Sequence, residues 1–140
     1  MVLKVVLDTN IYISALAFPG GHADEALRLA FEGRYQLFLS PAILAELANV
    51  LERKFKWDRP RSLEACRMLG EMAQVVRPKA RLSILKDEPD NRILECALMA
   101  HANRIVSGDH HLLDLGEFRG IKTETLSKFI AEFGSSTASG

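Results

Sequence analysis

Cysteine is scarce in this 140-residue sequence: there are two, Cys66 and Cys96, and they form no Cys-x-x-Cys pair. This spacing excludes a cysteine zinc site and a disulfide framework, and we expect both thiols to be small buried hydrophobes. No apolar run approaches the roughly 20 residues that a membrane-spanning helix needs. The first acid, Asp8, also comes too early for a signal peptide, so we expect a cytoplasmic protein that does not enter a membrane.

Net charge is also lacking, because 18 Lys and Arg residues balance 18 Asp and Glu residues. A protein that binds nucleic acid through its overall charge is usually basic, so only a local patch could serve that purpose here. One basic stretch is present, made of Arg53, Lys54, Lys56, Arg59 and Arg61. Such a stretch is more often a solvated face, but it could flank a path for phosphates.

Three common catalytic motifs are missing. The sequence contains no Gly-x-x-x-x-Gly-Lys loop, no Gly-x-Gly-x-x-Gly after a strand and no Gly-x-Ser-x-Gly elbow. These absences argue against a P-loop nucleotidase, a dinucleotide-binding enzyme and a serine hydrolase.

Apolar strand-like runs alternate with amphipathic helical segments along the chain. Strands are predicted over residues 2–7, 35–39, 81–85, 104–107 and 120–123. Helices are predicted over residues 10–18, 24–31, 41–55, 60–76, 89–100 and 126–133, with a helical turn over 110–115. This order is typical of an α/β fold, in which helices cover both faces of a central parallel sheet. We expect one domain over residues 1–134 and a polar, disordered tail over 135–140.

Four acids stand where such a fold can bring them together. Asp8 and Asp109 each follow a predicted strand, and ligand sites form at the carboxyl ends of strands in open α/β sheets. Glu46 lies in an otherwise apolar helix, and Asp90 lies in the first turn of its helix. Carboxylates suit hard cations such as Mg²⁺ or Mn²⁺, and these ions can activate water against a phosphodiester. Together the four acids predict a catalytic metal site.

Each acid also has a simpler interpretation. Asp8 and Asp109 could only cap helices, Asp90 could only favour the positive helix end, and Glu46 could be solvated or paired with an arginine. Three further polar residues could support the site: Asn10, His111 and Asp114.

Five segments of the sequence resemble the PIN domain, in particular the toxin components of VapBC-type toxin–antitoxin modules. They are residues 6–10 (VLDTN), 39–47 (LSPAILAEL), 90–97 (DNRILECA), 105–109 (IVSGD) and 118–122 (FRGIK). The resemblance spans nearly all of residues 2–133, and the order and spacing of the segments are more specific than any one of them.

The resemblance implies a three-layer α/β/α fold with a central parallel sheet of four to five strands. It implies an acidic pocket that binds Mg²⁺ or Mn²⁺ and cleaves RNA, with Asp8, Glu46, Asp90 and Asp109 as its acids. Asn10 would orient Asp8 or a water. Many relatives carry another acid at the position of His111, so this departure predicts weaker binding of a second ion, unless Asp114 substitutes for it.

A toxin of this kind would have an antitoxin partner whose tail fills the acidic groove. We also expect a homodimer, because the helices between residues 25 and 72 offer more apolar surface than one sheet face needs.

Two other functions compete with a metal-dependent ribonuclease. One is a catalytically silent module of the same fold that binds RNA or an antitoxin, which the His111 departure favours. The other is a metal-dependent phosphatase or a phosphoacceptor receiver domain. A phosphatase of the haloacid dehalogenase type needs a second Asp where Asn10 stands, and a receiver needs paired acids before its first helix, so neither pattern is present.

Overall fold

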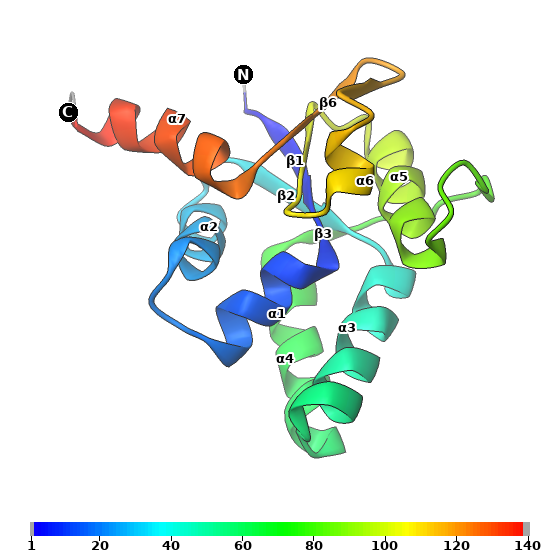
Figure 1. The fold of residues 1–140 in the computed structure, drawn as a ribbon. Coiled ribbons are helices and arrows are strands. Elements are labelled where there is room, and N and C mark those ends of the chain that lie inside the picture. Colours follow the sequence, from blue (N-terminus) through cyan, green and yellow to red (C-terminus); the bar gives the residue numbers. More distant parts are fainter. Residues whose placement is uncertain (1, 139–140) are drawn as a thin grey trace.

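The computed structural model describes residues 2–138, with side chains to residue 133. Its centre is a six-stranded sheet in the order β3-β2-β1-β4-β6-β5 (Figure 1). The strands are β1 (Lys4–Leu7), β2 (Gln36–Leu39), β3 (Gln74–Val75), β4 (Arg104–Val106), β5 (Glu117–Phe118) and β6 (Ile121–Glu124). All neighbouring pairs are parallel except β5 with β6. The central parallel sheet is therefore confirmed, although it has one more strand than predicted and an antiparallel edge.

The antiparallel edge is a tight hairpin that was not predicted from the sequence. Phe118 pairs with Ile121, and the two residues between them, Arg119 and Gly120, both have positive φ angles of 47° and 85°. Two consecutive positive φ angles are the mark of the hairpin turn whose twist matches that of the strands. Gly120 adopts this conformation without strain, so the strand predicted at 120–123 begins one residue later.

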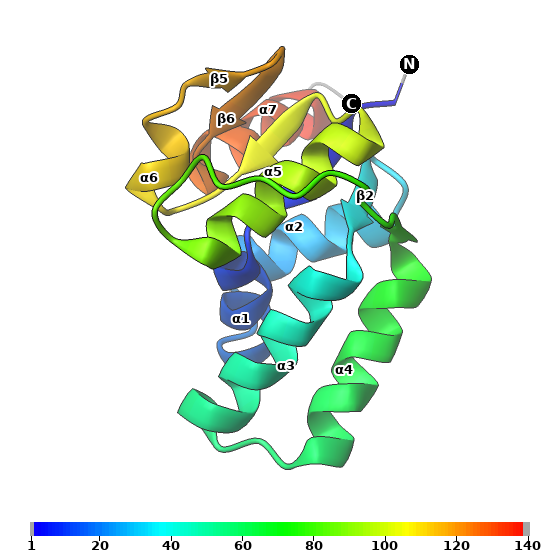
Figure 2. The same cartoon turned by 90° about the vertical axis from the view of Figure 1, so that its right-hand side faces the viewer.

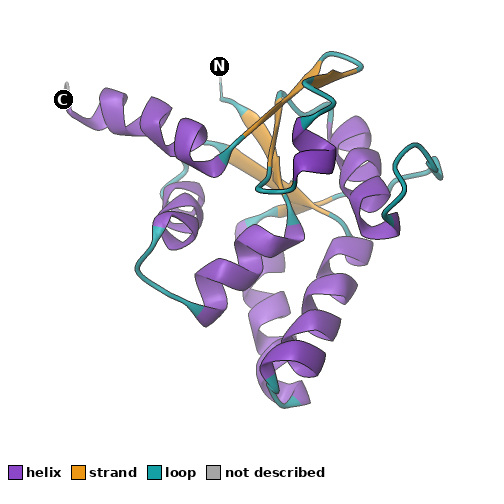
Figure 3. Cartoon of the chain, in the orientation of Figure 1, coloured by secondary structure: helices purple, strands orange, loops and turns teal. Residues whose placement is uncertain are grey.

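Seven helices surround the sheet in the described part of the chain (Figure 3). They are α1 (Thr9–Ala17), α2 (His22–Phe31), α3 (Pro41–Phe55), α4 (Arg59–Met72), α5 (Glu88–Ala100), α6 (His110–Leu113) and α7 (Leu126–Ala138). Helix α5 contacts β1, β2 and β4 on one face, and α2 and α7 lie behind the sheet in the same view (Figure 2). The three-layer architecture is thus confirmed. No helix of the described residues is long and apolar enough to cross a membrane.

Strong local signals fix the start of α3. Ser40 is its N-cap and accepts a hydrogen bond from the backbone N–H of Ile43, and Pro41 occupies the first turn. A proline there loses no helical hydrogen bond, because its nitrogen would have no partner in the helix. Ile43, Leu47, Val50 and Leu51 form the buried stripe that was expected. Helices α3 and α4 contact each other and extend away from the sheet (Figure 1).

Of two elements predicted around α4, the helix is too long at its end and the strand is wrong. The helix predicted over 60–76 ends at Met72, because the chain turns extended at Ala73 and Gln74–Val75 pairs with β2. The strand predicted over 81–85 is a loop, and its backbone groups bond to side chains of α5 instead of a neighbouring strand. The tail predicted over 135–140 overlaps α7, which the structure describes to Ala138, and residues 139 and 140 lie outside the described residues.

Candidate active site

Asp8 and Asp109 lie at the carboxyl ends of two neighbouring strands. β1 pairs with β2 on one side and β4 on the other, so the chain order reverses between β1 and β4. Asp8 directly follows β1 and its backbone N–H donates to the carbonyl of Val106 at 2.9 Å. Asp109 follows β4 by three residues and is the N-cap of α6. This reversal point is where open parallel sheets form their ligand crevice.

The hydroxyl of Ser107 connects these two acids. It donates to Asp8 Oδ2 at 2.7 Å and accepts from the backbone N–H of Asp109 at 2.8 Å. Burial raises the pKa of Asp8, while the Ser107 hydrogen bond opposes this change and the charge of Asp109 adds to it. Ser107 is fully buried, so its hydroxyl orients Asp8 without competition from water. Ser107 was not among the site residues predicted from the sequence.

Asp90 from α5 joins the same cluster. Its side chain is 4% exposed, and its Oδ2 atom has no hydrogen-bond partner. The pKa of Asp90 is raised from the ordinary 3.8 to about 7, first by burial and then by nearby carboxylates, with Asp109 the largest contributor. A buried carboxylate oxygen without a partner is costly unless a proton or a cation neutralises it.

Asp87 is the fourth carboxylate and was not among the site residues predicted from the sequence. Ligand oxygens of Asp87, Asp90 and Asp109 lie within 4.8 Å of one another, which is close enough to share an ion. Its position depends on Asn91, whose side chain accepts from the backbone N–H groups of Ile84 and Leu85 and donates to the carbonyl of Leu85. An acid three residues before Asp90, at a helix N-cap, was the available signal.

Glu46 lies beside this cluster and not in it. It lines a groove of about 430 Å³ between α3 and the start of α5, together with Thr9, Arg81 and Glu88. Among the described residues, no group of possible ligands that could share one ion includes Glu46. Asp8 is outside these groups as well, but its charge raises the pKa of Asp90. Thr9 follows Asp8 and Glu88 follows Asp87, so the groove opens next to the carboxylates. We call it the site groove.

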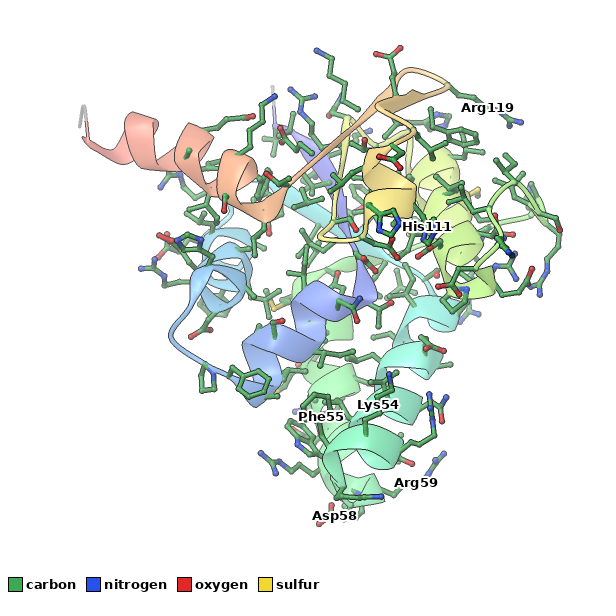
Figure 4. All side chains as sticks on the ribbon, in the orientation of Figure 1. Lys54, Phe55, Asp58, Arg59, His111 and Arg119 are labelled. Carbon is green, nitrogen blue, oxygen red and sulfur yellow. The ribbon has the colours of Figure 1, made fainter. Side chains whose placement is uncertain are left out.

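The three supporting residues differ in their contacts. Asn10 is exposed, and its backbone N–H, not its side chain, lowers the pKa of Asp8. His111 lies 3.2 Å through Nδ1 from Asp109 Oδ1, and its backbone N–H donates to the same oxygen at 2.8 Å (Figure 4). Asp109, His110 and His111 also form a possible ligand group. Asp114 is exposed at the end of α6 and joins neither ligand group of the described chain.

The donor set of the cluster fits a hard divalent cation. Asp87, Asp90 and Asp109 offer only carboxylate oxygens, and Asp8 lies near enough to raise the pKa of Asp90. Such oxygen sites suit Mg²⁺ or Mn²⁺, which would supply the positive charge that Asp90 Oδ2 lacks. This arrangement defines a class of protein: an α/β domain with a cation-binding carboxylate cluster at the switch point of its sheet.

Comparison with known proteins identifies the family. The sequence model of the PIN domain matches residues 4–111, and the chain belongs to this family, whose members are generally nucleases. An uncharacterized protein of Methanocaldococcus jannaschii is 30% identical over 143 residues, which span 94% of this chain and 92% of that protein.

Two solved structures share the fold at low sequence identity. VapBC2 from Rickettsia felis, bound to a DNA fragment from its promoter, aligns at 16% identity with a TM-score of 0.64, over 88% of this chain and 98% of that chain. VapBC-1 from nontypeable Haemophilus influenzae aligns at 17% identity with a TM-score of 0.58, over 89% of this chain and 99% of that chain.

Proposed function

We propose that this protein is a metal-dependent endoribonuclease that hydrolyses RNA phosphodiester bonds at the carboxylate cluster. The observation that carries this proposal is the unpartnered, buried Oδ2 of Asp90 beside Asp87 and Asp109. Three carboxylates this close repel one another unless a cation stands between them. Membership of a nuclease family supplies the reaction class.

The carboxylates of the site would have different roles in this reaction. Asp87, Asp90 and Asp109 would hold Mg²⁺ or Mn²⁺, and Asp8 would add a ligand or orient a water, held in place by Ser107. A bound divalent ion supplies Lewis acidity and neutralises charge that builds on a phosphodiester. Glu46 faces the site groove, where it would accept a proton from an attacking water rather than hold the ion directly.

The test is cleavage of a single-stranded RNA by purified protein with Mn²⁺, with Mg²⁺ and with chelator. Asp8→Asn should lower cleavage at least 100-fold while the circular dichroism spectrum stays unchanged, because electrostatic groups at the reacting centre contribute about this much. Asp114→Asn is the matched control: it removes a carboxylate outside the cluster and should keep activity within about twofold. Equal activity of Asp8→Asn and the control would contradict the assignment.

We further propose that the protein acts as the toxin of a toxin–antitoxin module. The fold neighbours from Rickettsia felis and Haemophilus influenzae are VapBC complexes. An antitoxin would present an extended or helical tail to the site groove, with a basic side chain near the carboxylates. A homodimer is proposed on the exposed apolar side chains of Phe31 and Met68, which flank a hollow of about 370 Å³. Light scattering on the purified chain, alone and after co-expression with the product of the adjacent gene, tests both partners.

A catalytically silent binding module is the second candidate. It is favoured by the separation of Glu46 from the other acids and by His111 at the edge of the cluster. Calorimetry distinguishes the two functions: a silent module would bind RNA but show no heat with Mn²⁺ and no metal-dependent cleavage.

A further inference from the structure

A second groove adjoins the site groove, and four of its five charged side chains are cations. It has a volume of about 310 Å³ and lies between the start of α3 and the loop that precedes α5. Its charged side chains are Arg77, Lys79, Arg81, Arg92 and Glu95. The two grooves share Ala42, Arg81 and Arg92, so they lie side by side. We call the second one the basic groove.

Most of its positive charge is not used inside the protein. Arg92 is 11% exposed and pairs with Glu95 at 2.8 Å, so these two charges cancel. Arg81 lies 3.8 Å from Glu88, but both side chains are mostly exposed and such pairs hold weakly. Within the described chain, no ion pair involves Arg77 or Lys79. Two or three cations are therefore available to an anionic ligand.

The loop that carries these cations has no helix or strand, yet α5 holds it in place (Figure 3). Glu95 accepts from the backbone N–H of Leu82 at 2.6 Å, and Arg92 donates to the Leu82 carbonyl at 2.8 Å. Both α5 side chains are largely buried, so water competes little with these bonds. The preceding residues, 77–81, leave β3 and reach this anchor, which places Arg77 and Lys79 along the groove wall.

We infer that the basic groove holds the phosphate backbone of single-stranded RNA next to the carboxylate cluster. This inference rests on the proposed nuclease function. The cluster itself repels phosphates, and a chain of zero net charge has no general attraction for RNA, so a local set of cations must supply it. The described lining of both grooves contains no aromatic side chain, so base stacking is not available and phosphate contacts dominate.

The stretch from Arg53 to Arg61, which the sequence suggested as a phosphate path, lies elsewhere. Lys54 and Arg59 stand at the far end of the α3–α4 pair, away from His111 (Figure 4). Helix α3 has 15 residues and begins at the basic groove. At 1.5 Å per residue its far end is about 22 Å away. Arg59 also pairs with Glu52, and Arg61 lies over the Trp57 ring at 3.7 Å.

The experiment compares RNA binding by three proteins that all carry Asp8→Asn, so that the probe stays intact in Mg²⁺. Fluorescence anisotropy with a labelled 12-nucleotide single-stranded RNA is recorded from 50 to 500 mM salt. The first protein has no other change, the second adds Arg77→Gln and Lys79→Gln, and the third adds Arg53→Gln and Lys54→Gln as a control of equal charge. Gel analysis of the probe confirms that it is uncut.

Loss of two phosphate contacts should make the negative slope of the log association constant against log salt shallower by about 1.4, and weaken binding about 25-fold at 0.1 M salt. The control should bind like the first protein. Equal weakening of both variants, an unchanged slope, or no binding by the first protein would overturn the inference. Because binding is read without cleavage, an inactive wild-type protein that binds RNA through Arg77 and Lys79 would refute the nuclease proposal and leave the basic groove standing.

Discussion

Asp90→Asn should stabilise the metal-free protein above neutral pH while it abolishes metal-dependent cleavage. The wild-type carboxylate is 4% exposed, leaves Oδ2 without a partner and lies beside Asp87 and Asp109. An amide of the same shape carries no charge, so the substitution removes both the cost of burying the charge and the repulsion between neighbours. The gain in the free energy of unfolding must depend on pH, because the wild-type Asp90 side chain is also neutral below its pKa.

The size of the effect follows from the pKa of Asp90, which rises from 3.8 in the unfolded chain to about 7 in the fold. A raised carboxyl pKa means that the native state holds more protons between these two values, so stability falls as pH rises from about 4 to about 7 and is then level. At 1.36 kcal/mol per pKa unit, the charge of Asp90 lowers the free energy of unfolding by about 4 kcal/mol at pH 8 and by about 2 kcal/mol at pH 5. Asp90→Asn should therefore gain about 2 kcal/mol more at pH 8 than at pH 5.

Urea unfolding in chelator at pH 5 and pH 8 measures this difference. Asp8 and Glu124 also have raised pKa values, that of Glu124 about 6, so wild type and variant share some loss of stability with pH. The comparison between the two proteins isolates Asp90, and Asp114→Asn shows what removal of an exposed carboxylate does. The reasoning is refuted if Asp90→Asn is destabilised equally at both pH values, or if wild-type stability does not decline relative to the variant.

Two further substitutions test how the carboxylates are positioned. Ser107→Ala removes the hydroxyl that joins Asp8 to the backbone of Asp109. Mn²⁺ affinity measured by calorimetry should therefore fall about 10- to 100-fold, as expected for residues that orient metal ligands. Ser14 is exposed, and Ser14→Ala should leave the Mn²⁺ affinity unchanged. Asn91→Ala leaves the backbone groups of Ile84 and Leu85 without partners, so the free energy of unfolding should fall by about 3 kcal/mol. Protease should also cut the loop over residues 76–87 faster. An unchanged cutting rate would show that other contacts hold the loop.

The central part of the fold could be predicted because its signals are local. The run Val5, Val6 and Leu7 is fully buried, as its β-branched, apolar sequence predicts for an interior parallel strand, and Ser40 with Pro41 marked the start of α3. The edges of the sheet carried weaker signals. β3 and β5 have two residues each, which is too short for a pattern of their own. β3 pairs with β2, which is far away in the sequence, and β5 pairs with β6 across a two-residue turn.

The candidate site divides in the same way. Strand ends fixed Asp8 and Asp109, because the carboxyl ends of neighbouring parallel strands must lie at one edge. Glu46 was grouped with them because it is an acid in an otherwise apolar helix and because of the family resemblance, and the structure places it on the wall of the site groove. Helix periodicity gives the face on which a side chain lies, but not how closely that face approaches a strand end. The distance between Glu46 and the other acids could therefore not be predicted from the sequence.

The loop before α5 shows why Asp87 and the basic groove were missed together. Residues 76–87 follow no periodic pattern, and their arrangement comes from side chains of the next helix: Asn91 holds the end near Asp87, and Arg92 with Glu95 holds the middle near Leu82. One face of α5 thus positions both a carboxylate of the cluster and the cations beside it. A chain with zero net charge can in this way have the anionic carboxylate cluster and the cationic basic groove near each other. The fold, and not the composition, separates the two kinds of charge.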